Sequence, residues 1–151
     1  RARAYRDRGQ YPEAILDLEH ALKIRGNTAN LHFEIGEVYY RWQGAKQLRK
    51  AIRAYNRAVA LQKDLGQAYC RIAEIQIDRQ KLPLAYRAAK KCVRYSPKSG
   101  SGHLSLGMLH KERGKMKLAV QELRTSLRVD PTGEFADRTR EELDQLLRYR
   151  R

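Results

Sequence analysis

The chain has 151 residues, of which 42% are hydrophobic and 32% are charged. An apolar share this large excludes a disordered chain, and the length suffices for one domain with a continuous core. The 32 Lys and Arg residues outnumber the 17 Asp and Glu residues and give a net charge of +15, which attracts anions without choosing among nucleic acid, acidic lipid and acidic protein.

Apolar residues recur at helical spacing along almost the whole chain, interrupted by turn residues. The first residues read like the middle of a motif, so we interpret the chain as a fragment of a longer protein. The final helix is more charged than the others, as expected of a helix that caps a repeat array. The predicted helices cover residues 11–25, 29–42, 46–61, 66–79, 82–95, 100–113, 116–129 and 133–149.

A repeat relates these helices. An apolar, small, small, proline series recurs after 34 residues (106 − 72), first at Ile72, Ala73, Ala85 and Pro97 and then at Leu106, Gly107, Ala119 and Pro131. Because glycine inside a helix costs about 1 kcal/mol relative to alanine, Gly107 predicts a close approach of two helices. The copy before these is three residues longer, and the insertion either lengthens a turn or adds part of a turn to the second helix.

With this spacing the sequence resembles the tetratricopeptide repeat family. The segments HLSLGMLH, AVQEL and SLRVDP match its pattern in the last copy, and HFEIGEVY and AIRAY match it in the second. His32, Tyr69 and His103 depart from it, since the family favours Trp there. The resemblance implies an all-α solenoid of antiparallel helix pairs in a single domain, residues 1–151. Its parts would be a partial repeat (1–28), a repeat with the insertion (29–65), two further repeats (66–99 and 100–132) and a C-terminal capping helix (133–151).

The resemblance also implies a concave groove lined by the first helix of each pair. The chain would then be a scaffold or adaptor that holds a partner peptide or segment there. Acidic groups beside apolar ones favour a neutral or basic-apolar ligand, and they argue against the terminal carboxylate that some chaperone-binding members of the family hold. Packing against the next helix is the competing interpretation of the apolar positions. The groove positions are Asn30, Phe33, Glu37, Tyr40, Gln67, Cys70, Glu74, Ile77, Leu104 and Met108.

The second helices carry basic residues along one face, at spacings such as i, i+3, i+4 and i+7. This face should be convex, and it is either a solvated surface or a site for an acidic protein, a nucleic acid backbone or an acidic membrane. Nucleic acid is not favoured, because only Tyr55 and Tyr95 interleave with the basic residues. The basic positions are Lys46, Arg49, Lys50, Arg53, Arg57, Arg87, Lys90, Lys91 and Arg94.

The sequence contains no catalytic motif that we recognise, and no phosphate-binding glycine loop. His103 and His110 lie seven residues apart on one helix without a third metal ligand, so we predict no metal, no cofactor and no enzymatic activity. Cys70 and Cys92 lack metal or redox spacing, and we predict reduced thiols in a cytoplasmic protein. An incomplete first repeat would expose the apolar face of YPEAILDLEHAL, residues 11–22, and favour self-association.

Overall fold

A computed structural model describes residues 10–149 of the chain. The regular structure in this range is entirely helical, which confirms the predicted all-α class. The helix bounds agree closely with the predicted ones, except that the last helix begins three residues later. Residues 10–149 contain eight helices: α2 (Tyr11–Arg25), α3 (Ala29–Trp42), α4 (Ala45–Leu61), α5 (Gly66–Asp78), α6 (Leu82–Tyr95), α7 (Gly100–Glu112), α8 (Met116–Val129) and α9 (Ala136–Tyr149).

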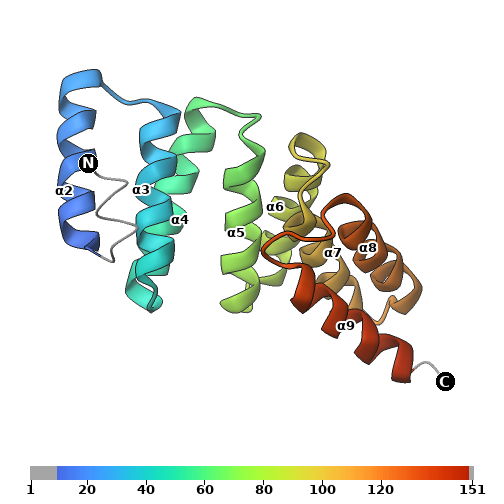
Figure 1. Cartoon of the computed structure of the whole chain (residues 1–151). Coiled ribbons are helices and arrows are strands. Elements are labelled where there is room, and N and C mark those ends of the chain that lie inside the picture. Colours follow the sequence, from blue (N-terminus) through green and yellow to red (C-terminus); the bar gives the residue numbers. More distant parts are fainter. Residues whose placement is uncertain (1–9, 150–151) are drawn as a thin grey trace. The chain divides into compact units, whose positions relative to one another are not determined.

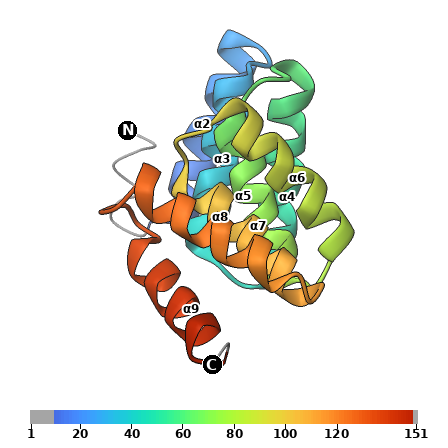
Figure 2. The same ribbon diagram turned by 90° about the vertical axis from the view of Figure 1, so that its right-hand side faces the viewer.

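The chain divides into two compact units, residues 1–68 and 69–151, with the division inside the first turn of α5. Unit 1 contains α2, α3 and α4, and unit 2 contains most of α5 and all of α6 to α9. In each unit, successive helices run antiparallel and pack side by side, as α3 and α4 do in Figure 1 and α7 and α8 do in Figure 2. The basic element is therefore a helix pair.

In unit 1, the pairing of α3 with α4 depends on a small residue opposite a large one. Tyr55 of α4 is fully buried, and a Cβ atom added to Gly36 of α3 would lie 2.6 Å from its ring. Glycine at this position is thus required for the tyrosine to enter the helix interface. The core of the unit continues towards α2 through Ile15, Leu18 and Val38.

Unit 2 repeats this arrangement between α7 and α8. A Cβ atom on Gly107 would lie 2.8 Å from the Leu123 side chain and 3.3 Å from the Ala119 carbonyl oxygen. The unfavourable helix propensity of Gly107 is therefore offset by packing, as the sequence predicted. Helix α9 then covers Val120 and Leu123 with Leu146, which closes the C-terminal end of this core.

Local signals explain where the helices begin and end. The Thr28 hydroxyl accepts a hydrogen bond from the Leu31 N–H (3.2 Å) and caps the start of α3. Helices α6 and α8 end two residues before Pro97 and Pro131, which cannot continue them. The three inserted residues lengthen the second helix of their repeat, since α4 has 17 residues whereas α6 and α8 have 14.

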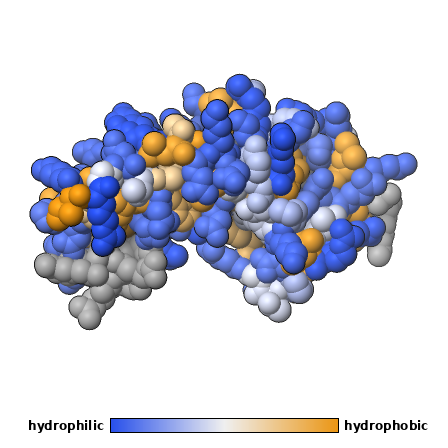
Figure 3. All heavy atoms as spheres, turned by 90° about the horizontal axis from the view of Figure 1, so that it is seen from above, coloured by the Kyte–Doolittle hydropathy of each residue, from blue (hydrophilic) through white to orange (hydrophobic). Residues whose placement is uncertain are grey.

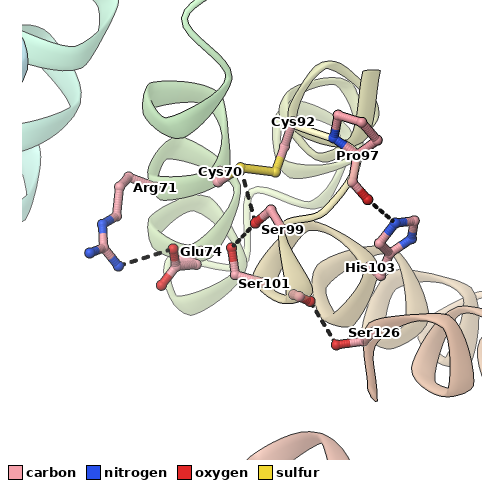
Figure 4. The surroundings of a disulfide bond; sticks show 10 residues. Cys70, Arg71, Glu74, Cys92, Pro97, Ser99, Ser101, His103 and Ser126 are labelled. Carbon is pink, nitrogen blue, oxygen red and sulfur yellow. Dashed lines mark hydrogen bonds and ion pairs between the residues drawn. A yellow bond between two sulfur atoms is a disulfide. The ribbon is translucent and has the colours of Figure 1, made fainter. Parts of the chain in front are cut away.

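A disulfide joins Cys70 of α5 to Cys92 of α6, with the two Cα atoms 4.8 Å apart. The prediction of reduced thiols was therefore wrong. Figure 4 shows that the bond crosslinks two neighbouring helices, close to Ser99 at the start of α7. Sequence spacing could not reveal the pair, because 22 residues separate the cysteines and only the antiparallel packing of α5 on α6 brings them together.

Candidate functional site

The predicted groove positions of unit 1 differ in accessibility. Asn30 and Gln67 are exposed, and Phe33 and Tyr40 are half-buried. Glu37, by contrast, is buried and accepts a 2.6 Å hydrogen bond from the Tyr55 hydroxyl of α4. This carboxylate is part of the helix interface, so it offers little to a ligand and gives the surface less negative character than the sequence suggested.

In unit 2, several predicted groove positions also belong to the interior. Cys70 and Leu104 are 5% and 3% exposed, so neither presents much surface for contact. Glu74 lies 3.5 Å from the Arg71 guanidinium, an ion pair that Figure 4 shows on α5. The acid predicted for the groove is therefore already paired with a cation of its own helix.

Ile77 and Met108 are the two predicted groove residues that the structure brings together. They line a pocket of about 220 Å³ in unit 2, between the end of α5, the end of α7 and helix α9. Leu82 and Leu109 add apolar surface, and the charged lining groups are Lys111, Glu112 and Glu142. Gln80 adds a polar side chain to the lining. Lys111 lies 3.4 Å from the Glu142 carboxylate, so these two charges offset each other and the exposed Glu112 supplies the remaining charge.

The predicted basic face is accessible. All nine of its residues are exposed except Lys50, which is half-buried. In the view from above in Figure 3, hydrophilic residues cover most of the surface and apolar residues appear in scattered groups. The structure also places tyrosine rings beneath the basic groups: Lys50 lies over Tyr39 at 5.5 Å, and Lys91 over Tyr69 at 5.3 Å. Sequence reasoning missed these contacts, because the tyrosines belong to neighbouring helices or to core positions.

A second pocket, of about 240 Å³, lies in unit 1 among α2, α3 and α4. Helix α4 contributes Lys50, Arg53 and Arg57, spaced i, i+3 and i+7, so that all three lie on one face. Helix α2 contributes Glu19 and Leu22 from the opposite side. The remaining lining residues are His32, Ile35, Tyr39 and Ala54.

The histidines His32 and His103 occupy the same repeat position in the two units, yet their environments shift their pKa values in opposite directions. Burial, and secondarily the positive charge of Arg57, lowers the pKa of His32. The pKa of His103 is raised, chiefly by its 2.8 Å hydrogen bond to Glu122. Its other ring nitrogen donates to the Pro97 carbonyl (3.2 Å), and two acceptors together favour the doubly protonated ring.

Two further properties of residues 10–149 bear on function. No helix in this range is long and apolar enough to cross a membrane. No group of three His, Cys, Asp or Glu side chains is arranged to hold a metal ion within the same range.

The folded repeats define a class of protein, the helical-repeat solenoids. Family models for the TPR repeat and the tetratricopeptide repeat match residues 2–42 and 101–132. These two matches confirm the resemblance to the tetratricopeptide repeat family that the sequence motifs indicated. No curated protein sequence matches it.

Solved structures agree on the fold. The chain is similar to PilF of Pseudomonas aeruginosa (18% identity, 99% of this chain and 65% of that chain covered, TM-score 0.82). It is also similar to the MamA protein (16% identity, coverage 98% and 83%, TM-score 0.76). The TPR domain of Arabidopsis OM64 matches less of it (21% identity, coverage 78% and 95%, TM-score 0.66). At these identities the likeness shows the fold, which generally serves protein–protein interaction and not catalysis.

Proposed function

We propose that the chain is a non-enzymatic adaptor that binds an apolar or basic-apolar segment of a partner protein in the unit 2 pocket. The observation that carries the proposal is that Ile77 and Met108 line one pocket, to which helices α5, α6, α7 and α9 all contribute. Apolar side chains in such a depression are the usual anchors for peptide ligands. The exposed Glu112 in the lining favours a basic group beside the apolar anchor.

The test measures fluorescence anisotropy with a labelled eight-residue peptide of alternating Lys and Leu. Replacing both Ile77 and Met108 by Ala removes buried contact area, and we expect binding to weaken about tenfold, which corresponds to about 1.4 kcal/mol. Leu84→Ala is the matched control, because Leu84 is an exposed apolar residue of α6 that does not line the pocket. Equal weakening by the control, or unchanged binding in the double variant, would refute the pocket assignment.

The basic face supports a second candidate function, the binding of an anionic partner. The accessibility of Arg87, Lys90 and Arg94 on α6 favours it, since no acidic residue lies within that helix. Charge reversal at these three residues should strongly reduce the binding of a polyanion such as heparin at low salt. Undiminished binding would leave the face as a solvated surface.

The disulfide bears on where the protein works. The cytoplasmic location stays a prediction, and the Cys70–Cys92 bond argues against it, because disulfides persist mainly in oxidising compartments. Thiol alkylation in intact cells, followed by mass spectrometry, distinguishes a cytoplasmic location from an oxidising compartment. Alkylated cysteines would support the cytoplasm, and protected cysteines an oxidising compartment.

A further inference from the structure

The pocket of unit 1 carries an inference that is independent of the unit 2 site. It is lined by residues of α2 and α4, the second helices of their repeats, and of the first helix α3. The three cations of α4 face one acid of α2, Glu19, so the lining has a net charge of +2 (3 − 1) when His32 is neutral. The pocket thus combines a surplus of positive charge with an apolar interior.

The cations are available to a ligand. Arg53 and Arg57 are exposed, and within residues 10–149 neither of them forms an ion pair. A guanidinium presents a planar fork of N–H donors that matches a carboxylate in two parallel hydrogen bonds. The two arginines are therefore suited to bind acidic groups that a ligand supplies.

The spacing of these arginines suggests the form of the ligand. Arg53 and Arg57 lie four residues apart on a helix, a rise of about 6 Å. In an extended peptide, side chains two residues apart point to the same side and are separated by about 6.8 Å. An extended segment with acidic residues at positions i and i+2 can therefore place one carboxylate on each arginine. The intervening side chain would then point the other way, towards Leu22 of α2.

His32 supplies a further indication that the pocket accommodates a polar ligand. The ring is 6% exposed, and its Nε2 donates to the Asn27 side-chain oxygen at 3.4 Å. That leaves Nδ1 as an acceptor, and this atom is buried without a hydrogen-bond partner. An unsatisfied buried acceptor costs about 1–3 kcal/mol, a cost that a donor from a ligand would remove. A peptide has such donors in its backbone N–H groups.

We propose that the pocket between α2 and α4 binds an extended acidic-apolar segment of a partner protein, of the pattern acid–apolar–acid. Arg53 and Arg57 pair with the two carboxylates, and Leu22 receives the apolar side chain. Glu19 disfavours a nucleic acid, whose phosphates are uniformly negative and offer no apolar group to Leu22 or Ile35. The two arginines lie on a second helix, whereas the predicted groove positions lie on first helices. The site is also distinct from the unit 2 pocket.

The experiment uses a fluorescein-labelled eight-residue peptide of alternating Glu and Leu, measured by anisotropy against the whole chain. Arg53→Ala with Arg57→Ala should weaken its binding at least tenfold. Lys46→Ala with Arg49→Ala is the control, because it removes the same charge from exposed positions of the same helix that do not line the pocket. We expect the control to change the affinity less than threefold, and circular dichroism checks that both variants stay folded.

Three results would overturn the proposal. The first is equal weakening by the two variants, which would mean that only diffuse charge attracts the peptide. The second is that neither variant weakens binding. The third is that a 20-nucleotide oligo-dT displaces the labelled peptide at a concentration equal to or lower than that of the unlabelled peptide, which would make nucleic acid the better occupant. Since Ile77 and Met108 are unchanged in these variants, each result leaves the unit 2 proposal unaffected.

Discussion

The two pockets are built from the same repeat and differ in their chemistry. In unit 1 the pocket is lined by α2, α3 and α4, and its lining has three cations and one acid. In unit 2 the pocket involves the ends of the first helices α5 and α7, and its one lysine is paired with Glu142. The two pockets therefore share the helix-pair backbone of the repeat and differ in the charged side chains that line them.

The units also differ in covalent reinforcement, because the Cys70–Cys92 bond belongs to unit 2. Replacing both cysteines by Ala should lower the free energy of unfolding of this unit by about 3 kcal/mol, the value expected for a loop of this length. Urea denaturation with and without dithiothreitol measures the change. The double variant should be insensitive to the reductant, and an equal effect of reductant on variant and wild type would contradict the role of the bond.

Substitutions at the helix interfaces test whether both units need a glycine opposite a large side chain. Gly36→Ala and Gly107→Ala each force a Cβ atom against a partner side chain, Tyr55 or Leu123. We expect losses of about 1–3 kcal/mol from overpacking, partly offset by about 1 kcal/mol of helix propensity. Thermal unfolding measures both.

The matched control for this prediction is a double-mutant cycle. With Leu123→Ala already present, Gly107→Ala should cost less than in the wild type, because the space it needs has been vacated. Strictly additive effects would show that Leu123 is not the obstacle.

The apolar side of the unit 1 pocket provides a smaller test. Leu22→Ser should weaken the alternating Glu–Leu peptide about threefold to tenfold and leave an alternating Glu–Gly peptide unchanged, because the second peptide has no side chain to bury. Isothermal titration of both peptides measures the difference. If the binding of both peptides weakened equally, the substitution would have disturbed the fold and not the recognition of the apolar side chain.

The smallest expected effect concerns the two histidines at the shared repeat position. The pKa of His103 is raised in the folded state, so its contribution to stability is fully present below pH 6.5 and disappears as the pH rises through the folded pKa. The pKa of His32 is lowered, so its contribution is present above pH 6.5 and is lost as the pH falls through the folded value. NMR titration of the two rings should give pKa values on opposite sides of 6.5.

The control for the histidine comparison is Glu122→Gln, which removes the charge that raises the pKa of His103. The variant should move the titration of His103 to lower pH and leave His32 in place. Because the pair is partly exposed, the effect on stability should stay below about 1 kcal/mol. An unchanged titration of His103 would contradict the assigned cause.

Much of the fold could be predicted from the sequence, because local signals determine it. The series containing Gly107, Ala119 and Pro131 predicted a helix pair and its end, and the packing of Gly107 on Leu123 confirms the reason for the glycine. The disulfide was missed, because its geometry depends on how α5 and α6 pack and leaves no mark in the spacing of Cys70 and Cys92.

The candidate sites were less predictable. Periodicity placed Arg53 and Arg57 on one helix face, but it could not show that a pocket lined by Leu22 and Tyr39 lies beside them. The pairing of Glu74 with Arg71 and the burial of Glu37 likewise depend on side-chain contacts that a repeat pattern does not specify. A resemblance assigns a position to a surface, and the neighbouring side chains decide whether the position is accessible.

The two proposed sites lie in separate units and have opposite charge preferences. The most direct test is an NMR titration of the isotope-labelled chain with both peptides, one of alternating Glu and Leu and one of alternating Lys and Leu. We expect the acidic peptide to shift resonances of Leu22, His32 and Arg53, and the basic peptide to shift those of Ile77, Met108 and Glu112. If both peptides shift the same set, the proposal of two separate sites is wrong.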